Sequence, residues 1–366
     1  MYSNQLLIEN TNSNLIEVSN DEPYIQIKKM VLDGRHLQDM LDRISISEDS
    51  EGNYDYSSIS NIGMVYLYVH NRGRKRKIQT KVEYVRELLK FIEYVRIIGK
   101  ANIKELSRFD METLHSLLIR KYTKPKTSEK KLVIIRSFLT WCFEEGYLTK
   151  NISRGLRSIA SSKPNIPERD IEESDLKRAI IYYADHPKTQ SLLIILGISA
   201  LRLNEVITPK WGDLYFDKKR GRYYLKTLTK RDKVRHAHIK DYALKVLIEY
   251  RKRLGLNIAI NADDQTPFYP NRFGRHYSLS SLSTYLSKQM ADAKLTTIYG
   301  GRVTPHYLRH YFAQTAYTQG APLDWISETL GHSSSTITKE NYLSKLLKKE
   351  RDVSDFVDLD IGEHQE

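Results

Sequence analysis

The first seventy residues carry short apolar runs without a sustained period. The segment "SEDSEGNYDYSSIS" (47–60) is rich in serine and acidic residues, a composition typical of a loop. The run that follows, "GMVYLYVHNRGR" (63–74), alternates between apolar and polar residues and predicts a strand. We therefore expect a small appended domain over residues 1–72.

From residue 76 to residue 160 the apolar positions follow a helical period. Val85, Leu89 and Ile92 recur three or four residues apart, and Gly99 is placed to end that helix. This pattern predicts a compact helical domain. Two further helices are expected in it, near residues 110–121 and from Thr127 or Ser128 to Gly146.

The second half begins after a segment without any period. "SRGLRSIASSKPNIPERDIEES" (153–174) contains two prolines and many serines, so we place a linker at 161–173. The run "RYYLKTLTKRDKVRHAHI" (222–239) predicts two strands about a "KRDK" turn. The fold class is therefore mainly α (α+β), with a small antiparallel hairpin. Helices are expected near residues 174–186, 189–206, 240–254, 279–293, 304–319, 322–330 and 336–350.

Charge indicates a polyanionic partner. The formal net charge is +13, yet residues 1–60 hold eleven acidic side chains against four basic ones, and the tail 351–366 is acidic again. The basic excess begins at "NRGRKRKIQTK" (71–81) and favours nucleic acid, without separating binding from catalysis. The candidate DNA contacts are Arg74, Lys75, Arg76, Lys77, Lys81, Lys130, Lys131, Arg136, Lys233 and Arg235.

Several classes of protein are disfavoured by composition. No apolar run is long enough to span a bilayer, and the N-terminus has no basic region before an apolar core. The single cysteine, Cys142, excludes an intramolecular disulfide, and its apolar setting favours a core residue over a nucleophile. We expect an intracellular, cytoplasmic protein without a membrane partner.

The first candidate motif is "ISALRLNEVITPKW". Arg202 follows an unusually apolar helix, and Glu205 lies three residues later on the same helical face. A guanidinium held by a carboxylate is oriented to bind phosphate oxygens. Taken alone, such a pair is more often a structural ion pair at a helix end.

The second motif is "TLTKRDKVRHAHI". Lys230 lies where the first strand enters the turn, and Lys233 and Arg235 follow. A turn can carry one ammonium into a groove, although a basic surface hairpin has the same pattern.

The third motif is "VTPHYLRHYFAQ". Thr304 is a suitable N-cap and Pro305 suits the first helical position. His306 and Arg309 then share one face of the first turn, where backbone N–H groups favour an anion. His310 adds a second histidine, but the glutamate of the zinc protease motif is missing, so we expect no metal.

The fourth motif is "LGHSSSTITKENY" (330–342). Gly331 is placed to end a helix before His332, and Ser335 or Thr336 is a plausible cap for the helix that carries Tyr342. A serine nucleophile among residues 333–335 is disfavoured, because a Ser–His pair needs a third group to orient the histidine. We interpret these serines as turn and cap residues.

In this order, the four motifs resemble the tyrosine recombinase (phage integrase) family over about residues 78–345. The spacing from His332 to Tyr342 is one residue longer than the commonest in the family. The resemblance implies that Tyr342 is the nucleophile and that Glu205 supports the first arginine. It implies a catalytic set that also includes Arg202, Lys230, His306, Arg309 and His332.

The resemblance also implies an architecture and a reaction. A core-type DNA-binding domain (76–160) and a catalytic domain (174–350) would form a C-shaped clamp on double-stranded DNA with specific core sites. The family joins strands through a 3′-phosphotyrosyl link, needs neither metal nor ATP, and assembles as a homotetramer on DNA. Residues 1–72 would bind an arm site or a protein, the acidic tail would dock on a neighbouring protomer, and a directionality factor is a possible further partner.

Several readings stay open at this point. Integration, excision or transposition of a mobile element is the leading hypothesis, and Xer-like resolution of chromosome or plasmid dimers is its alternative. A DNA-binding protein without catalysis on the same fold would not need the reactive residues. A type IB topoisomerase shares the chemistry, but the "PHYLRH" and "LGH" motifs and the separate helical domain favour a recombinase.

Overall fold

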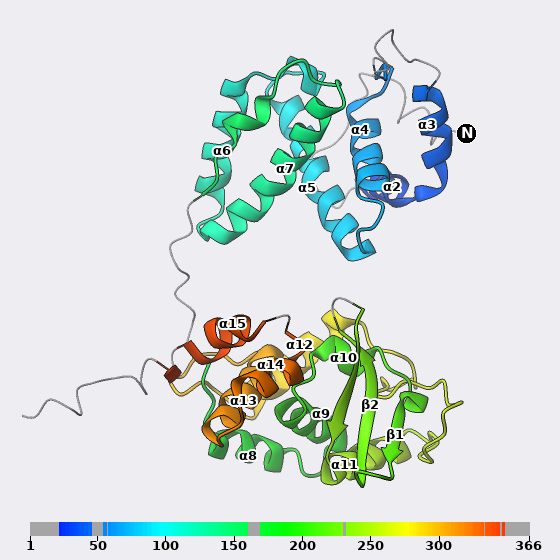
Figure 1. The fold of residues 1–366 in the computed structure, drawn as a ribbon, viewed down its shortest axis with the longest axis vertical. Helices are drawn as coiled ribbons and strands as arrows, with labels where there is room; N and C mark the ends of the chain where they lie inside the picture. The colour runs from blue at the N-terminus through cyan, green and yellow to red at the C-terminus, as the bar shows by residue number, and fades with distance from the viewer. Residues whose placement is uncertain are drawn as a thin grey trace, which may run out of the picture. The chain divides into compact units, whose positions relative to one another are not determined.

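The computed structural model forms two compact units, residues 1–164 and 165–366 (Figure 1). Lys230, most of the predicted linker and the acidic tail lie outside the described residues. The structure describes residues 22–45, 54–56, 58–159, 169–229, 232–332, 334–344 and 346–347.

The regular elements that the structure describes in the first unit are all helices or helical turns. Helix α5 ends as expected, with Gly99 in the left-handed conformation at φ 77°. Cys142 is fully buried on α7, as its apolar setting predicted. The elements are α2 (Glu22–Leu32), η1 (Gly34–His36), α3 (Leu37–Ser45), α4 (Asn61–Leu67), η2 (Tyr68–Arg72), α5 (Ile78–Ile97), η3 (Ile103–Glu105), α6 (Arg108–Lys121), α7 (Pro125–Glu144) and η4 (Ile152–Gly155).

The strand predicted at 63–74 is wrong. This segment forms α4 and the π-helical turn η2, and every residue from Met64 to Val69 is at most 1% exposed. An apolar run that is buried on all sides has no readable period, so alternation could not separate a strand from a helix.

The described residues of the N-terminal segment, expected as an appended domain over 1–72, pack with the helices that follow. Ile27 and Val31 of α2 and the buried residues of α4 belong to the same hydrophobic core as α5 and α7. The described part of the N-terminal segment is therefore one packing unit with the helices that follow it.

The second unit combines helices with one antiparallel sheet of order β1–β2–β3, which confirms the mainly α fold class. Strand β1 was not predicted; its Tyr215 faces Tyr224 of β2. Leu225 and Ala237 pair across β2 and β3 and are buried. The elements are α8 (Glu173–Tyr182), α9 (Pro187–Ile198), α10 (Leu203–Ile207), η5 (Trp211–Asp213), β1 (Leu214–Asp217), β2 (Arg222–Leu228), β3 (Val234–Ile239), α11 (Asp241–Arg253), α12 (Leu279–Asp292), α13 (Pro305–Thr318), α14 (Leu323–Leu330), α15 (Ser335–Thr338) and η6 (Lys339–Leu343).

The single helix predicted over 189–206 is two helices. Helix α9 ends at Ile198, and Ala200 adopts the left-handed conformation at φ 55°, which is rare for a residue with a side chain. Helix α10 starts afresh after Arg202, whose backbone N–H donates to the Glu205 carboxylate at 3.1 Å. The apolar run hid this break because α9 is buried on nearly every side.

Helix α9 is the centre of this unit, since it packs against both α11 and α13 (Figure 1). The end of α9, the start of α13 and the loop after α14 therefore meet in one region. Within the described residues, no helix is long and apolar enough to cross a membrane.

Candidate active site

The first turn of α10 places a buried carboxylate, that of Glu205, among three guanidinium groups. Glu205, only 1% exposed, accepts from Arg202 at 2.6 Å and from Arg235 at 2.9 Å, and its Oε2 lies 4.0 Å from Nη1 of Arg309. One carboxylate cannot neutralise three guanidinium groups. The cluster therefore carries excess positive charge and is suited to bind an anion.

Arg309 is fixed from several sides. Its guanidinium donates to the carbonyl oxygens of Ala200 and Leu330, and its Nε lies 3.4 Å from the hydroxyl of Tyr342. The left-handed conformation of Ala200 turns its carbonyl toward both Arg309 and Arg235. This conformation costs about 1–2 kcal/mol, and the two charged donors offset it.

Arg202 is the member of this cluster that remains most accessible. Its side chain is 29% exposed, whereas that of Arg309 is 1% exposed. An anion that enters the pocket can therefore reach Arg202 without displacing protein contacts.

Tyr342 lies in the same pocket, at a π-helical turn. The segment η6 follows α15 directly, and such turns are frequent at functional sites. The phenol ring of Tyr342 stacks on His310 with centroids 4.1 Å apart and planes 24° apart. Its centroid lies 5.1 Å from that of His332 and 6.0 Å from that of His306.

His332 is delivered by the helix stop that the sequence predicted. Gly331 adopts the left-handed conformation at φ 62° and ends α14. Nδ1 of His332 then lies 2.7 Å from Oγ1 of Thr338, and its Nε2 lies 3.5 Å from Nη2 of Arg309. Thr338 is fully buried and thus orients this imidazole, a role that its place in "SSSTITKENY" did not indicate.

Two predicted caps differ from the structure. Ser334, rather than Ser335 or Thr336, caps α15, because its hydroxyl accepts from the backbone N–H of Thr336 at 3.1 Å. Thr304 occupies the N-cap position of α13 without a side-chain cap bond, while Pro305 takes the first turn as expected. The turn-and-cap interpretation of the serines therefore fits Ser334.

Burial favours the neutral form of the His306, His310 and His332 imidazoles. Burial, followed by the neighbouring Arg309 and Arg202, lowers the pKa of His332 to about 4. Partial burial and then Arg309 also lower the pKa of His306, although this ring stays exposed on one side. Burial lowers the pKa of His310 to about 2. A neutral imidazole can accept a hydrogen bond at neutral pH, and a bound phosphate anion would raise its pKa and make it a better proton acceptor.

We expect the stability of this unit to decrease as the pH falls below 6.5. The unfolded chain protonates His310 near its ordinary pKa of about 6.5, whereas the folded chain does not, so unfolding takes up protons. This group alone should lower the free energy of unfolding by about 1.4 kcal/mol between pH 7.5 and pH 5.5. Urea unfolding followed by circular dichroism at both values should show a smaller difference in His310→Phe; an identical difference would contradict the assignment.

The predicted basic hairpin is only partly a surface feature. Arg235 does not face outward: its side chain is 9% exposed and donates to the carbonyl oxygens of Ser199 and Ala200 and to Glu205. Arg235 therefore belongs to the arginine cluster, because alternate residues of β3 point to the core, and its role as a DNA contact stays a prediction. Lys233 is exposed and lines the pocket.

The basic residues proposed in the first unit fall into two groups. Arg74, Lys75 and Lys77 are exposed. The other members contact groups within the unit or are half-buried, although Lys130 keeps 64% of its side chain exposed. These contacts are Arg76 over the Tyr84 ring at 4.2 Å, Lys130 with Glu83 at 2.5 Å, Lys131 with Glu87 at 2.5 Å and Arg136 with Glu129 at 3.6 Å; Lys81 is half-buried.

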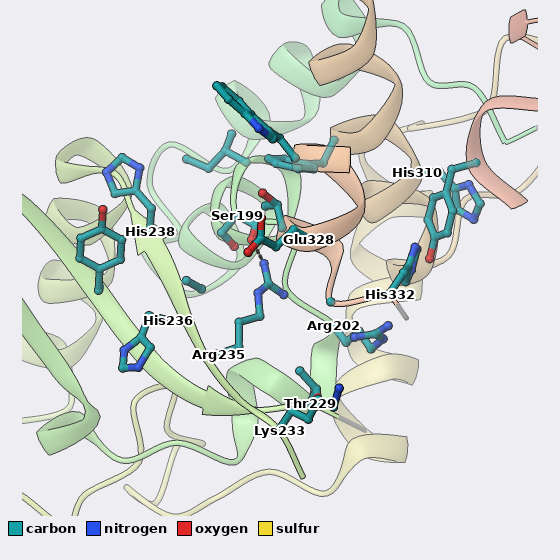
Figure 2. A pocket seen from close by; sticks show the side chains of 18 of the residues that line it. Ser199, Arg202, Thr229, Lys233, Arg235, His236, His238, His310, Glu328 and His332 are labelled. Atoms are coloured by element: carbon teal, nitrogen blue, oxygen red, sulfur yellow. Dashed lines mark hydrogen bonds between the residues drawn. The ribbon is translucent and has the colours of Figure 1, made fainter. Parts of the chain in front are cut away.

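Two members of the arginine cluster, Arg202 and Arg235, line one solvent-open pocket of the second unit together with Tyr342 and the three histidines. His310, His332 and Arg202 lie on one side of it, Arg235 lies near the middle, and His236 and His238 of β3 lie on the opposite side (Figure 2). No sequence pattern indicated Arg169, which also lines the pocket. Among the residues that the structure describes, no group of three or more His, Cys, Asp or Glu side chains is arranged to hold a metal ion.

The amino-acid sequence of this chain is similar to those of known proteins. The model of the phage integrase family matches residues 170–348. The tyrosine recombinase XerC of Pediococcus pentosaceus is 24% identical over 271 residues, which cover 73% of this chain and 87% of the relative.

Solved structures show the same fold at low identity. The XerH site-specific recombinase, in a post-cleavage complex with palindromic difH substrate, has a TM-score of 0.59 and 17% identity, over 93% of this chain and 98% of that one. A lambda integrase dimer bound to a COC′ core site has a TM-score of 0.59 and 15% identity, over 92% of this chain and 88% of that one.

Proposed function

Because this chain belongs to the phage integrase family of tyrosine recombinases, we propose that it cleaves and rejoins double-stranded DNA at specific sites through a phosphotyrosyl intermediate. The observation that carries the proposal is the position of the Tyr342 hydroxyl. It lies 3.4 Å from Nε of Arg309, in a pocket that also contains neutral imidazoles and the accessible Arg202.

The proposed first step is an exchange of one phosphoester for another. The Tyr342 oxygen attacks the phosphorus, its proton passes to a neutral imidazole of His306 or His332, and the bond from phosphorus to the 5′-oxygen breaks. The 3′-phosphate is then bound to the tyrosine, and a 5′-hydroxyl from a partner strand reverses the step. The phosphoester bond is conserved throughout, so we propose no cofactor.

The arginine cluster supplies the electrostatic part of this mechanism. The pentavalent transition state carries more negative charge than the diester, and fixed guanidinium groups stabilise it without having to reorganise. Arg202 and Arg309 would bind the non-bridging oxygens, with Glu205 fixing both in place. Lys230, which lies outside the described residues, would protonate the leaving 5′-oxygen as general acid.

DNA binding would use both units as a clamp, with synapsis by four copies of the chain. The DNA complexes of XerH and lambda integrase, and a lambda integrase tetramer bound to a Holliday junction, support this part of the proposal. The excess of basic side chains over acidic ones is consistent with a polyanionic ligand.

Two biological outcomes share this chemistry. We propose integration or excision of a mobile element as the leading one. Resolution of chromosome or plasmid dimers is the second candidate, and the relatives named XerC favour it. Recombination of a plasmid that carries two host resolution sites, compared with one that carries element ends, would separate the two.

The direct test uses a nicked suicide duplex in which the released strand diffuses away. Such DNA should leave the chain covalently attached to the 3′-phosphate, and mass spectrometry of the digested adduct should place the bond at Tyr342. Absence of any adduct with a duplex that the chain binds specifically would contradict the proposal.

We expect the affinity for DNA to fall steeply with salt, and Arg74 and Lys75 to contribute to that slope. Both side chains are exposed, so each can release one counterion from the DNA. Alanine at both positions should reduce the slope of log affinity against log salt by about 1–2. The slope is measured by fluorescence anisotropy between low and physiological salt.

The matched control for this measurement is Lys131→Ala. Nζ of Lys131 lies 2.5 Å from the buried Glu87, so this variant should lose stability rather than phosphate contacts. A slope unchanged in the double variant, or reduced equally in the control, would contradict the assignment.

A further inference from the structure

Arg169 lies within the predicted linker (161–173) and contacts helix α13, which carries His306 and Arg309. Its Nη1 lies 2.7 Å from Nε2 of His310. The next residue, Asp170, is fixed at both ends: its carboxylate accepts from Gln314 of α13 at 2.5 Å, and its carbonyl accepts from the backbone N–H of Ile298 at 3.0 Å. These bonds anchor the chain where it enters the second unit.

The contact with Arg169 determines the state of His310. A guanidinium can only donate, so Nε2 of His310 must accept, and the proton of the neutral imidazole then resides on Nδ1. His310 is 2% exposed, which excludes a reorientation into solvent.

His310 in turn fixes the ring of Tyr342. The two rings overlap with centroids 4.1 Å apart and planes 24° apart, closer to parallel than the 39° between His332 and Tyr342. The stacked surface restricts rotation of the phenol, and thereby the direction in which its oxygen points.

We propose that Arg169 is a positioning residue, which orients Tyr342 through His310 and so connects the entry of the second unit to the nucleophile. The inference rests on the proposed function in one respect only, namely that Tyr342 is the reacting group. It does not require Arg169 to touch DNA.

The competing role for Arg169 is a direct phosphate contact. It lines the solvent-open pocket, and its Nε is buried without a hydrogen-bond partner among the described residues. The two roles differ in one measurable respect: a phosphate contact acts independently of His310, whereas a positioning contact is lost when His310 cannot accept.

The first test does not depend on activity. A fluorotyrosine at position 342 reports the stacked imidazole through its ¹⁹F chemical shift. Arg169→Met should move or broaden this signal in the direction seen with His310→Ala, and Arg169→Lys, which keeps a donor, should restore part of it. An unchanged signal in Arg169→Met would overturn the proposal whether or not the chain cleaves DNA.

The second test is a double-mutant cycle on the rate of adduct formation at saturating DNA. Arg169→Met should slow the reaction on the order of 10²-fold, as expected when a reacting group is misplaced. In the His310→Phe background, which keeps a stacked ring but no acceptor, the same change should cost less than about twofold. Equal losses in both backgrounds would overturn positioning in favour of a phosphate contact.

Arg178→Met is the control for both tests, since this exposed arginine pairs with Asp175 on α8, away from the pocket. It should leave signal and rate unchanged. If the unsubstituted chain forms no adduct at all, the proposed function fails, while the ¹⁹F measurement still decides the positioning role.

Discussion

Tyr342→Phe is expected to abolish covalent attachment to DNA while leaving DNA binding intact. Phenylalanine keeps the ring that stacks on His310 and removes only the hydroxyl beside Arg309. Loss of a nucleophile has reduced turnover in another covalent enzyme by on the order of 10⁶-fold, so no adduct should be detected. Denaturing electrophoresis of the suicide-duplex reaction measures the adduct, and anisotropy measures an affinity that should change less than about threefold.

The matched control is Tyr317→Phe. Tyr317 packs against the same hydrophobic cluster as Tyr342, but it does not line the pocket. The Tyr317→Phe variant should form the adduct at the rate of the unsubstituted chain. An adduct that persists in Tyr342→Phe would refute the assignment of the nucleophile.

Glu205→Gln should cause the second large effect, on both folding and reaction. The substitution keeps the shape of the side chain but removes the negative charge between Arg202, Arg235 and Arg309. Breaking a buried ion pair by neutralising one partner costs about 3–5 kcal/mol, since the remaining charges stay desolvated. Urea unfolding should show this loss of stability. Adduct formation should fall at least 10²-fold, because the guanidinium groups of Arg202 and Arg309 lose their orientation.

An anion should partly restore the stability of Glu205→Gln. Sulfate or a short duplex can supply the missing negative charge, so either should stabilise this variant more than the unsubstituted chain. Glu249→Gln is the control, because its pair with Arg253 is about half exposed and should contribute less than about 1 kcal/mol. A Glu205→Gln chain as stable as this control would contradict the account of the cluster.

The helical period predicted most of the elements around the site, and the exceptions have a physical cause. Helices α5, α11, α12, α13 and α14 begin and end close to their expected positions, because each has one apolar face and a recognisable stop. The prediction failed at 63–74 and again at Ala200. In both places the apolar residues, 64–69 and those of α9, are buried on nearly every side, so the sequence pattern does not separate a strand or one long helix from the observed helices.

The residues proposed to react, and their order along the chain, can be identified from the amino-acid sequence alone. Each motif is local: a helix start places His306 and Arg309 on one face, and a glycine stop delivers His332. Tertiary structure alone decided their partners. Arg235 turned inward to Glu205, and Arg169 reached His310 across 141 positions of the chain. Contacts between segments so far apart depend on how α9, α13 and β3 pack. The spacing of residues along the sequence does not predict that packing.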